Sequence, residues 1–136
     1  CDTGSVDRAA LAALCAGLDW LDAPERRPRL ERARGQIKQL QDVVAGYGHA
    51  VPLGAGIARL PTLAFTVAGR APGEVAGALA THGVAASGGH QCAPLAHRHL
   101  GTGGGAIRLS VGPTTTDSDI ARACTALDAV LSEGAA

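Results

Sequence analysis

The chain has 136 residues, with twelve basic and twelve acidic side chains that give a formal net charge of zero. This length fits one domain with a substantial core, and the balanced charge argues against a cationic surface for nucleic acid or anionic membranes. Hydrophobic residues make up 46% of the chain but aromatic residues only 2%, so Leu, Val, Ile and Ala must build the core.

The four cysteines are scattered along the sequence, which is unlike the disulfide framework of a small secreted protein. The first residues lack the basic start and apolar run of a signal peptide. No apolar stretch approaches the ~20 residues needed to span a bilayer. We therefore expect a soluble, cytoplasmic protein. The first residue is not Met, which favours a fragment or a processed product.

Two helices are predicted in the first third of the chain. Apolar residues recur at steps of three and four over 6–21, with Ser5 able to cap the start. This stripe consists of Leu11, Leu14, Cys15, Leu18 and Leu21. Pro24 begins a second helix that reaches about residue 44, with its own apolar stripe of Leu30, Ile37, Leu40 and Val44.

The opposite face of the second helix carries half of the basic residues. They are Arg26, Arg27, Arg29, Arg32, Arg34 and Lys38. Such a run is either a solvated helix face or an anion-binding surface, and a solvated face is the commoner case. We interpret this long helix as a strut more than a core element.

The remaining chain alternates between strand and helix patterns. Strands are predicted over 51–53, 62–67, 84–86 and 106–111, and helices over 75–79, 94–100 and from Thr116 onward. Asp119 stands three residues after Thr116, as in a capping box, and a glycine turn precedes residue 106. The order predicts an α/β (α+β type) two-layer sandwich, in which helices cover a small, mostly antiparallel sheet.

Residues 87–92, Ser-Gly-Gly-His-Gln-Cys, place the thiol of Cys92 in a glycine-rich loop after a strand. A cysteine acts as a nucleophile when it is exposed and has electropositive neighbours. His90 can supply a proton relay or a positive charge, and glycines allow the backbone close to a substrate. The alternative is that Cys92 is a small buried hydrophobe.

Arg108 stands in the middle of the last predicted strand. Charged residues in such strands usually lie on a solvated face. If that face turns toward a cleft, the guanidinium can clamp a carboxylate with two hydrogen bonds. The sequence leaves both possibilities open.

A metal site is a further alternative, because four potential ligands lie within ten residues. They are His90, Cys92, His97 and His99. Imidazole and thiolate bind zinc and copper well. This spacing is not that of a standard structural zinc site, so we predict no metal ligand.

Several motifs follow one another in a characteristic order. They are Pro61-Thr-Leu-Ala-Phe-Thr-Val, Glu74-Val-Ala-Gly-Ala-Leu, Gly83-Val, Gly89-His-Gln-Cys-Ala-Pro, Ile107-Arg-Leu-Ser and Thr116-Asp-Ser-Asp-Ile. This series resembles the C-terminal part of class V aminotransferase-like enzymes. These are fold-type-I pyridoxal-phosphate enzymes, which include cysteine desulfurases, selenocysteine lyases and carbon–sulfur lyases. Asp2-Thr-Gly-Ser resembles the segment that closes their large domain.

The resemblance implies roles for five residues. Cys92 would take sulfur from a sulfur-containing amino acid as a persulfide, with His90 assisting. Arg108 would hold the substrate carboxylate. Gly4 and Ser5 would contact the phosphate of pyridoxal 5'-phosphate, commonly across the interface of a homodimer. The implied fold is that of the C-terminal domain of these transferases.

Departures from the family pattern leave the reaction open. Ser87 stands where the family usually has Arg, Gln91 replaces a second His, and Thr114-Thr-Thr116 replaces Tyr-Asn-Thr. A β-lyase, which eliminates without a thiol nucleophile, fits comparably with a desulfurase.

The chain also lacks a lysine suited to the cofactor's Schiff base. Pyridoxal-phosphate chemistry needs such a lysine, and Lys38, the only one present, lies on the basic helix face. A solvated lysine keeps its proton and forms imines poorly. We therefore expect a fragment that is inactive alone and pairs with a missing large domain that binds the cofactor.

On this interpretation, residues 1–48 are the end of the large domain with connecting helices, and residues 49–136 are the small domain. Two alternatives stay open: a non-catalytic binding or interaction module of the same fold, and a small metal-binding domain.

Overall fold

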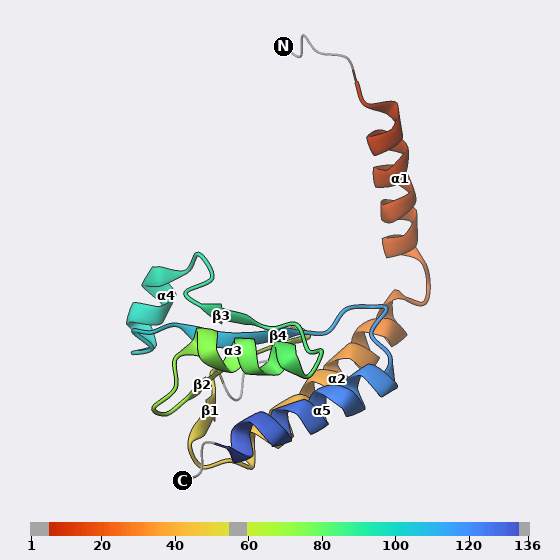
Figure 1. Cartoon of the computed structure of the whole chain (residues 1–136). Coiled ribbons are helices and arrows are strands. Elements are labelled where there is room, and N and C mark those ends of the chain that lie inside the picture. The colour runs from red at the N-terminus through yellow and green to blue at the C-terminus, as the bar shows by residue number, and fades with distance from the viewer. Residues whose placement is uncertain (1–5, 55–59, 134–136) are drawn as a thin grey trace.

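The computed structural model describes residues 6–54 and 60–133 (Figure 1). The helices are α1 (Arg8–Asp22), α2 (Arg26–Ala45), α3 (Pro72–Thr81), α4 (Pro94–His99) and α5 (Asp117–Ser132). The strands are β1 (Ala50–Pro52), β2 (Thr62–Val67), β3 (Ser87–Gly89) and β4 (Ala106–Ser110). The strands form one antiparallel sheet in the order β1-β2-β4-β3. The predicted fold class, helices covering a small antiparallel sheet, is confirmed.

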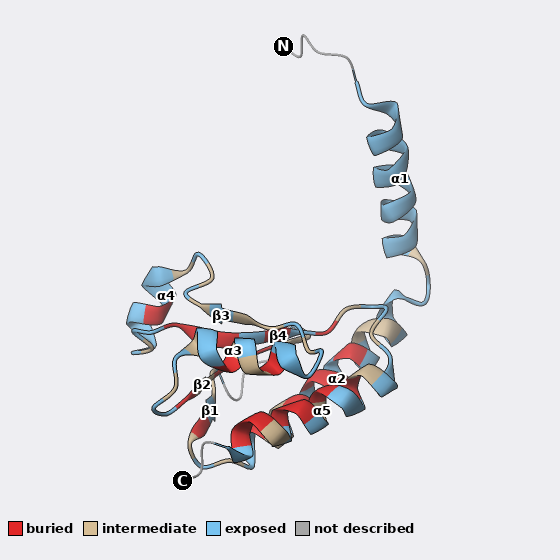
Figure 2. Ribbon diagram, in the orientation of Figure 1, coloured by how far each residue is buried: buried red, intermediate tan, exposed pale blue. Residues whose placement is uncertain are grey.

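One face of the sheet packs on helices and makes the core. Along β2, Leu63, Phe65 and Val67 are buried, and the residues between them are partly exposed. This alternation is expected of a strand with one covered face. The helices α2 and α5 lie side by side beneath this face (Figure 2).

The helix α2 is part of that core. Ala33, Ile37, Leu40 and Val44 are all buried on it. The interpretation of this helix as a strut is therefore wrong, because its apolar stripe packs against α5 and the sheet, as the apolar face of an amphipathic helix requires. The proposed division at residue 48 stays a prediction, although α2 shares its core with the strands that follow.

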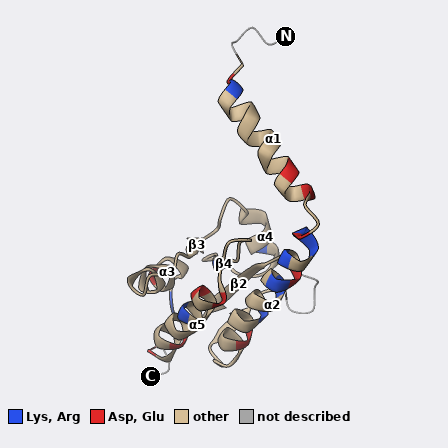
Figure 3. Cartoon of the chain, turned by 90° about the vertical axis from the view of Figure 1, so that its right-hand side faces the viewer, with Lys and Arg blue, Asp and Glu red and all other residues tan. Residues whose placement is uncertain are grey.

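The basic face of α2 is partly neutralised by carboxylates of the same helix region. Arg34 pairs with Glu31 at 2.7 Å, and Lys38 pairs with Asp42 at 2.6 Å. Figure 3 shows basic and acidic residues interspersed along this helix. These exposed i,i+3 and i,i+4 pairs favour a solvated face.

The helix α1 extends away from the rest of the molecule and has no buried residue (Figure 2). Asp7 caps it, accepting hydrogen bonds from the backbone N–H groups of Ala9 and Ala10 at 3.0 Å. The predicted cap, Ser5, lies outside the described residues, as does Gly4. The predicted leucine stripe is present but exposed, with Leu14 at 57% and Leu18 at 51%.

The strand expected over 84–86 is displaced. Those residues are not in a strand, and the paired segment is Ser87–Gly89. The observed strand contains Gly88, where a Cβ atom would lie 2.8 Å from the Gly73 nitrogen and closer still to the Pro72 carbonyl. A residue without a side chain allows β3 to lie against the start of α3.

Candidate functional site

The side of the sheet away from α2 and α5 carries small residues around one arginine. We call this side the open face. Arg108 lies opposite Ala64 on β2 and opposite Ser87 on β3. Residues opposite each other in an antiparallel pair point to the same side. Thr62 and Ser110 also share this face, with their hydroxyl oxygens 3.4 Å apart.

Arg108 is exposed, and its side chain has neither a hydrogen bond nor an ion pair with any residue in the described part of the chain. Several of the other arginines, though not all of them, are engaged. Arg70 donates to the Val130 carbonyl at 2.7 Å, and Arg122 pairs with Asp119 at 2.5 Å. An unpaired guanidinium with two small cross-strand neighbours is free to bind an anion from outside the described chain.

Cys92 lies in the short loop between β3 and α4. Its side chain is exposed, and its φ of 61° follows a φ of 50° at Gln91. Two views show this loop rising on the side of the sheet away from α2 and α5 (Figures 1 and 3). The strand register places Arg108 on the same side, opposite Ala64 and Ser87. No hydrogen bond joins Cys92 to Arg108 or to His90 within residues 6–54 and 60–133.

The other described cysteines have different surroundings. Cys124 is partly buried against the core, and this burial raises the pKa of its thiol above the usual value. Cys15 is exposed on α1. Cys92 is thus the exposed thiol that the described sheet carries on a loop next to its open face.

Two side chains beside Cys92 fasten the loop. The Nε2 atom of His90 donates to the Gly103 carbonyl at 2.9 Å, since a carbonyl can only accept. The Nε2 atom of Gln91 donates to the Ala106 carbonyl at 2.9 Å and to the Ser87 carbonyl at 3.3 Å. The sequence carries no signal for these contacts, because they join positions brought together only by the fold.

His97, on α4, packs against the residue at the start of this loop, His90. It is buried, its Nδ1 atom lies 2.8 Å from the Thr102 hydroxyl, and its ring packs edge-on against His90 at 5.4 Å. No group of three or more His, Cys, Asp or Glu in the described ranges is placed to hold a metal ion. The four potential ligands noted in the sequence therefore do not converge into a metal site.

The single lysine of the chain, Lys38, does not lie on the open face. Lys38 is on α2, on the opposite side of the sheet, with 71% of its side chain exposed and its ammonium bound to Asp42. The ion pair holds this amine on the outer side of α2, away from Arg108 and Cys92. The residues described here therefore do not make a covalent site for pyridoxal phosphate.

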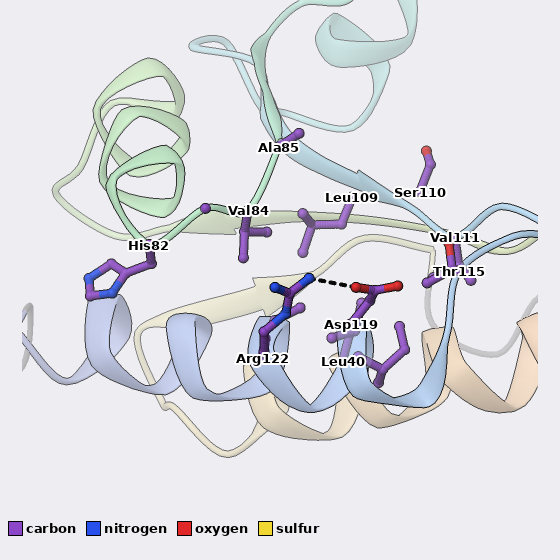
Figure 4. Close-up of a pocket in the computed structure, with 13 residues that line it drawn as sticks. Leu40, His82, Val84, Ala85, Leu109, Ser110, Val111, Thr115, Asp119 and Arg122 are labelled. Carbon is purple, nitrogen blue, oxygen red and sulfur yellow. Dashed lines mark hydrogen bonds and ion pairs between the residues drawn. The ribbon is translucent and has the colours of Figure 1, made fainter.

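A cavity of about 330 Å³ lies between α5, the end of β4 and the segment after α3 (Figure 4). His82, Ser110, Asp119 and Arg122 line it, whereas Arg108 and Cys92 do not. The pKa of Asp119 is lowered, first by hydrogen bonds from Thr116 and then by Arg122. These contacts are those of the predicted capping box of α5, which is confirmed.

The family model of aminotransferase class-V matches residues 1–123. The cysteine desulfurase CsdA (S-sulfonic acid) from Escherichia coli matches with a TM-score of 0.85 and 25% identity, over 97% of this chain and 32% of that chain. An NifS-like protein from Rickettsia africae shares the fold, with a TM-score of 0.57 and 19% identity, over 72% of this chain and 28% of that chain.

No curated protein matches the chain. The chain spans about a third of the length of the desulfurase that it matches. None of the helices in the described ranges has both the length and the apolar content needed to cross a bilayer. The family match covers most of the sequence, and the structural match to the desulfurase extends over nearly all of it. This chain therefore belongs to the aminotransferase class-V family.

Proposed function

We propose that this chain is the C-terminal part of a pyridoxal-phosphate-dependent cysteine desulfurase or related carbon–sulfur lyase. Its task is to supply Arg108 and Cys92 to an active site completed by other polypeptide. One observation carries the proposal: Arg108 stands unpaired on an open sheet face of small residues, next to a loop with an exposed thiol.

Arg108 binds the substrate carboxylate. Its guanidinium offers two parallel N–H groups that match the two carboxylate oxygens. Ala64 and Ser87, its cross-strand neighbours, are too short to cover it and carry no charge. Binding of a carboxylate to Arg108 therefore breaks no internal ion pair. The guanidinium is available to any small amino acid that can lie on the open face.

In the desulfurase reaction, the Cys92 thiolate attacks the sulfur of a bound cysteine. A sulfur–sulfur bond forms on Cys92 as the carbon–sulfur bond breaks, and that bond's electron pair stays on the substrate carbon, which takes up a proton. The products are a persulfide and alanine. His90 assists, because its Nε2–H is committed to Gly103 and its Nδ1 atom is left to hold or move a proton.

Pyridoxal phosphate, when bound to the whole enzyme, supplies the electron sink for this chemistry. The lysine that holds it lies on polypeptide outside these 136 residues, since Lys38 is paired with Asp42. Gly4 and Ser5 are proposed contacts of the cofactor phosphate and lie outside the described residues. The chain is accordingly inactive alone.

The exposed leucine stripe of α1 is evidence for a larger assembly. A helix with four leucines on one face and no buried residue is expected to pack against further polypeptide. The structural match to the desulfurase extends over 97% of this chain. We propose that the rest of the enzyme covers α1, that residues 1–48 join the two domains, and that the enzyme is a cytoplasmic homodimer.

The β-lyase is the second candidate. Ser87 and Gln91 replace residues that the desulfurase pattern usually has as Arg and His. A β-lyase eliminates the sulfur group directly and needs no thiol from the enzyme. After hydrolysis by one water molecule its products are pyruvate, ammonia and a thiol, whereas a desulfurase leaves alanine and enzyme-bound sulfur.

The test uses the full-length enzyme with Cys92→Ala, and Cys15→Ala as the matched control because Cys15 is an exposed thiol elsewhere. A desulfurase loses alanine formation with Cys92→Ala and keeps it with Cys15→Ala. Unchanged pyruvate formation in both variants identifies a β-lyase. Failure of the full-length protein to bind pyridoxal phosphate overturns both and leaves a non-catalytic module of this fold.

A further inference from the structure

We propose that Gln91 is a positioning residue that holds Cys92 in place above the sheet. The inference builds on the proposed function, because Cys92 needs a fixed position only if it meets a substrate. It concerns a residue that differs from the family pattern, so the pattern itself does not predict its role.

The first support is the way the Gln91 amide is used. Its Nε2 group donates to two backbone carbonyls, that of Ser87 in β3 and that of Ala106 in β4. An amide has two N–H donors, so both are engaged. The side chain thereby ties the loop to both strands that flank it.

The second support is the backbone conformation. Gln91 and Cys92 have φ values of 50° and 61°. They are the two non-glycine residues with positive φ in the described ranges. L-residues rarely adopt this region because the Cβ atom approaches the following carbonyl oxygen, so the surrounding contacts must impose it.

The third support is that Cys92 has no anchor of its own. Its side chain is exposed and makes no hydrogen bond with any described residue. Its position comes from its neighbours: the His90–Gly103 bond on one side, the Gln91 bridge beside it, and the turn in which the Ala93 N–H donates to the His90 carbonyl at 2.9 Å.

The test places a nitroxide spin label on Cys92 of the full-length enzyme, with its other reactive cysteines replaced (within this chain, Cys1→Ser, Cys15→Ser and Cys124→Ala). Gln91→Glu keeps the shape but removes both donors. Gln91→Gly removes the side chain yet accepts the φ of 50° without strain. Gln39→Glu, an exposed glutamine on α2, is the control for the change of charge.

We expect the label on this exposed side chain to have the same mobility in the parent and in Gln39→Glu, and to be several-fold more mobile in both Gln91 variants because the backbone beneath it moves, with an unchanged Tm. An unchanged label mobility in Gln91→Glu overturns the inference. So does a label that loosens in Gln91→Glu but not in Gln91→Gly, because charge repulsion and not the lost bridge would then be the cause.

In the full-length enzyme, Gln91→Glu should lower kcat for alanine formation by about 100-fold, the cost typical of a 1 Å misplacement, with KM unchanged. An unchanged kcat overturns the positioning role. The proposed function fails separately: Cys92→Ala would then leave turnover intact, while the spin label would still report whether Gln91 holds the loop.

Discussion

Arg108 on β4 lies directly opposite Ser87 on β3, and both residues face the side of the sheet that no helix of the α2–α5 layer covers. The pairing leaves the guanidinium uncovered, because serine is short and offers no charge to neutralise it. An arginine in this setting costs the fold little and is available to a ligand.

Replacing Arg108 should therefore damage substrate binding and leave stability unchanged. In the full-length enzyme, we expect Arg108→Ala to raise KM for the amino acid by about 10- to 100-fold, as for the loss of a charge-assisted pair worth about 1.5–3 kcal/mol. Arg108→Lys should recover part of this, because it keeps the charge and loses the fork. Steady-state kinetics measure both effects.

Arg98→Ala is the matched control, since Arg98 is exposed on α4 and its side chain makes no hydrogen bond to a described residue. It should leave KM unchanged. An Arg108→Ala enzyme with the parent's KM would show that the open face does not receive the substrate.

Gly88 is required for the close contact between β3 and α3. A Cβ at this position would lie 2.6 Å from the Pro72 carbonyl carbon and 2.8 Å from the Gly73 nitrogen. These are backbone atoms that cannot rotate away. We expect Gly88→Ala to lower the free energy of unfolding by about 2 kcal/mol or more, measured by urea denaturation.

Gly77→Ala provides the comparison, because Gly77 lies on α3 with nothing within 4 Å of an added Cβ. Alanine is favoured over glycine in a helix by about 0.5–1 kcal/mol, so this variant should be more stable than the parent. Equal effects of the two substitutions would contradict the described contact.

Phe65 is the one phenylalanine of the chain and is fully buried in β2, between the sheet and the helices. In a core built otherwise from aliphatic residues, its removal leaves a cavity that small neighbours cannot fill. We expect Phe65→Ala to cost about 3–5 kcal/mol. Thr66→Ala, on the open face next to it, should cost less than about 1 kcal/mol in the same urea denaturation.

The sequence predicted the elements whose signals are local. The strand over 62–67 and the capping box at Thr116 and Asp119 were found as expected, because alternation and capping are properties of neighbouring residues. The prediction that α2 is a strut is wrong. The sequence shows the basic face of this helix, but it does not show that α5, some eighty residues away, packs against the apolar face.

The residue types of the candidate site can be recognised in the sequence, whereas the contacts among them cannot. Cys92, His90 and Arg108 stand out as chemical groups in glycine-rich and strand segments. The bridge from Gln91 to Ser87 and Ala106, and the support of His90 by His97, depend on how β3, α4 and β4 fold together. No periodicity in the sequence encodes such contacts.

Tyr47 offers a spectroscopic test of the packing of α5, since it is the sole tyrosine of the chain. Its hydroxyl donates to the Asp128 carboxylate, and this hydrogen bond, with burial and the nearby negative charge, raises its pKa above 10.0. The bond exists only while the phenol keeps its proton. Its contribution to stability is therefore complete below pH 10 and is lost as the pH rises through the raised pKa.

We expect the phenolate absorbance to titrate with a midpoint above 10.0, and Asp128→Asn to bring that midpoint down toward the ordinary value. Asp42→Asn is the control, because Asp42 is an exposed carboxylate that pairs with Lys38 on the outer side of α2. A titration midpoint that does not change in Asp128→Asn would contradict the described contact between Tyr47, just after α2, and the last turns of α5. The described packing of α2 against α5 beneath the sheet would then be wrong.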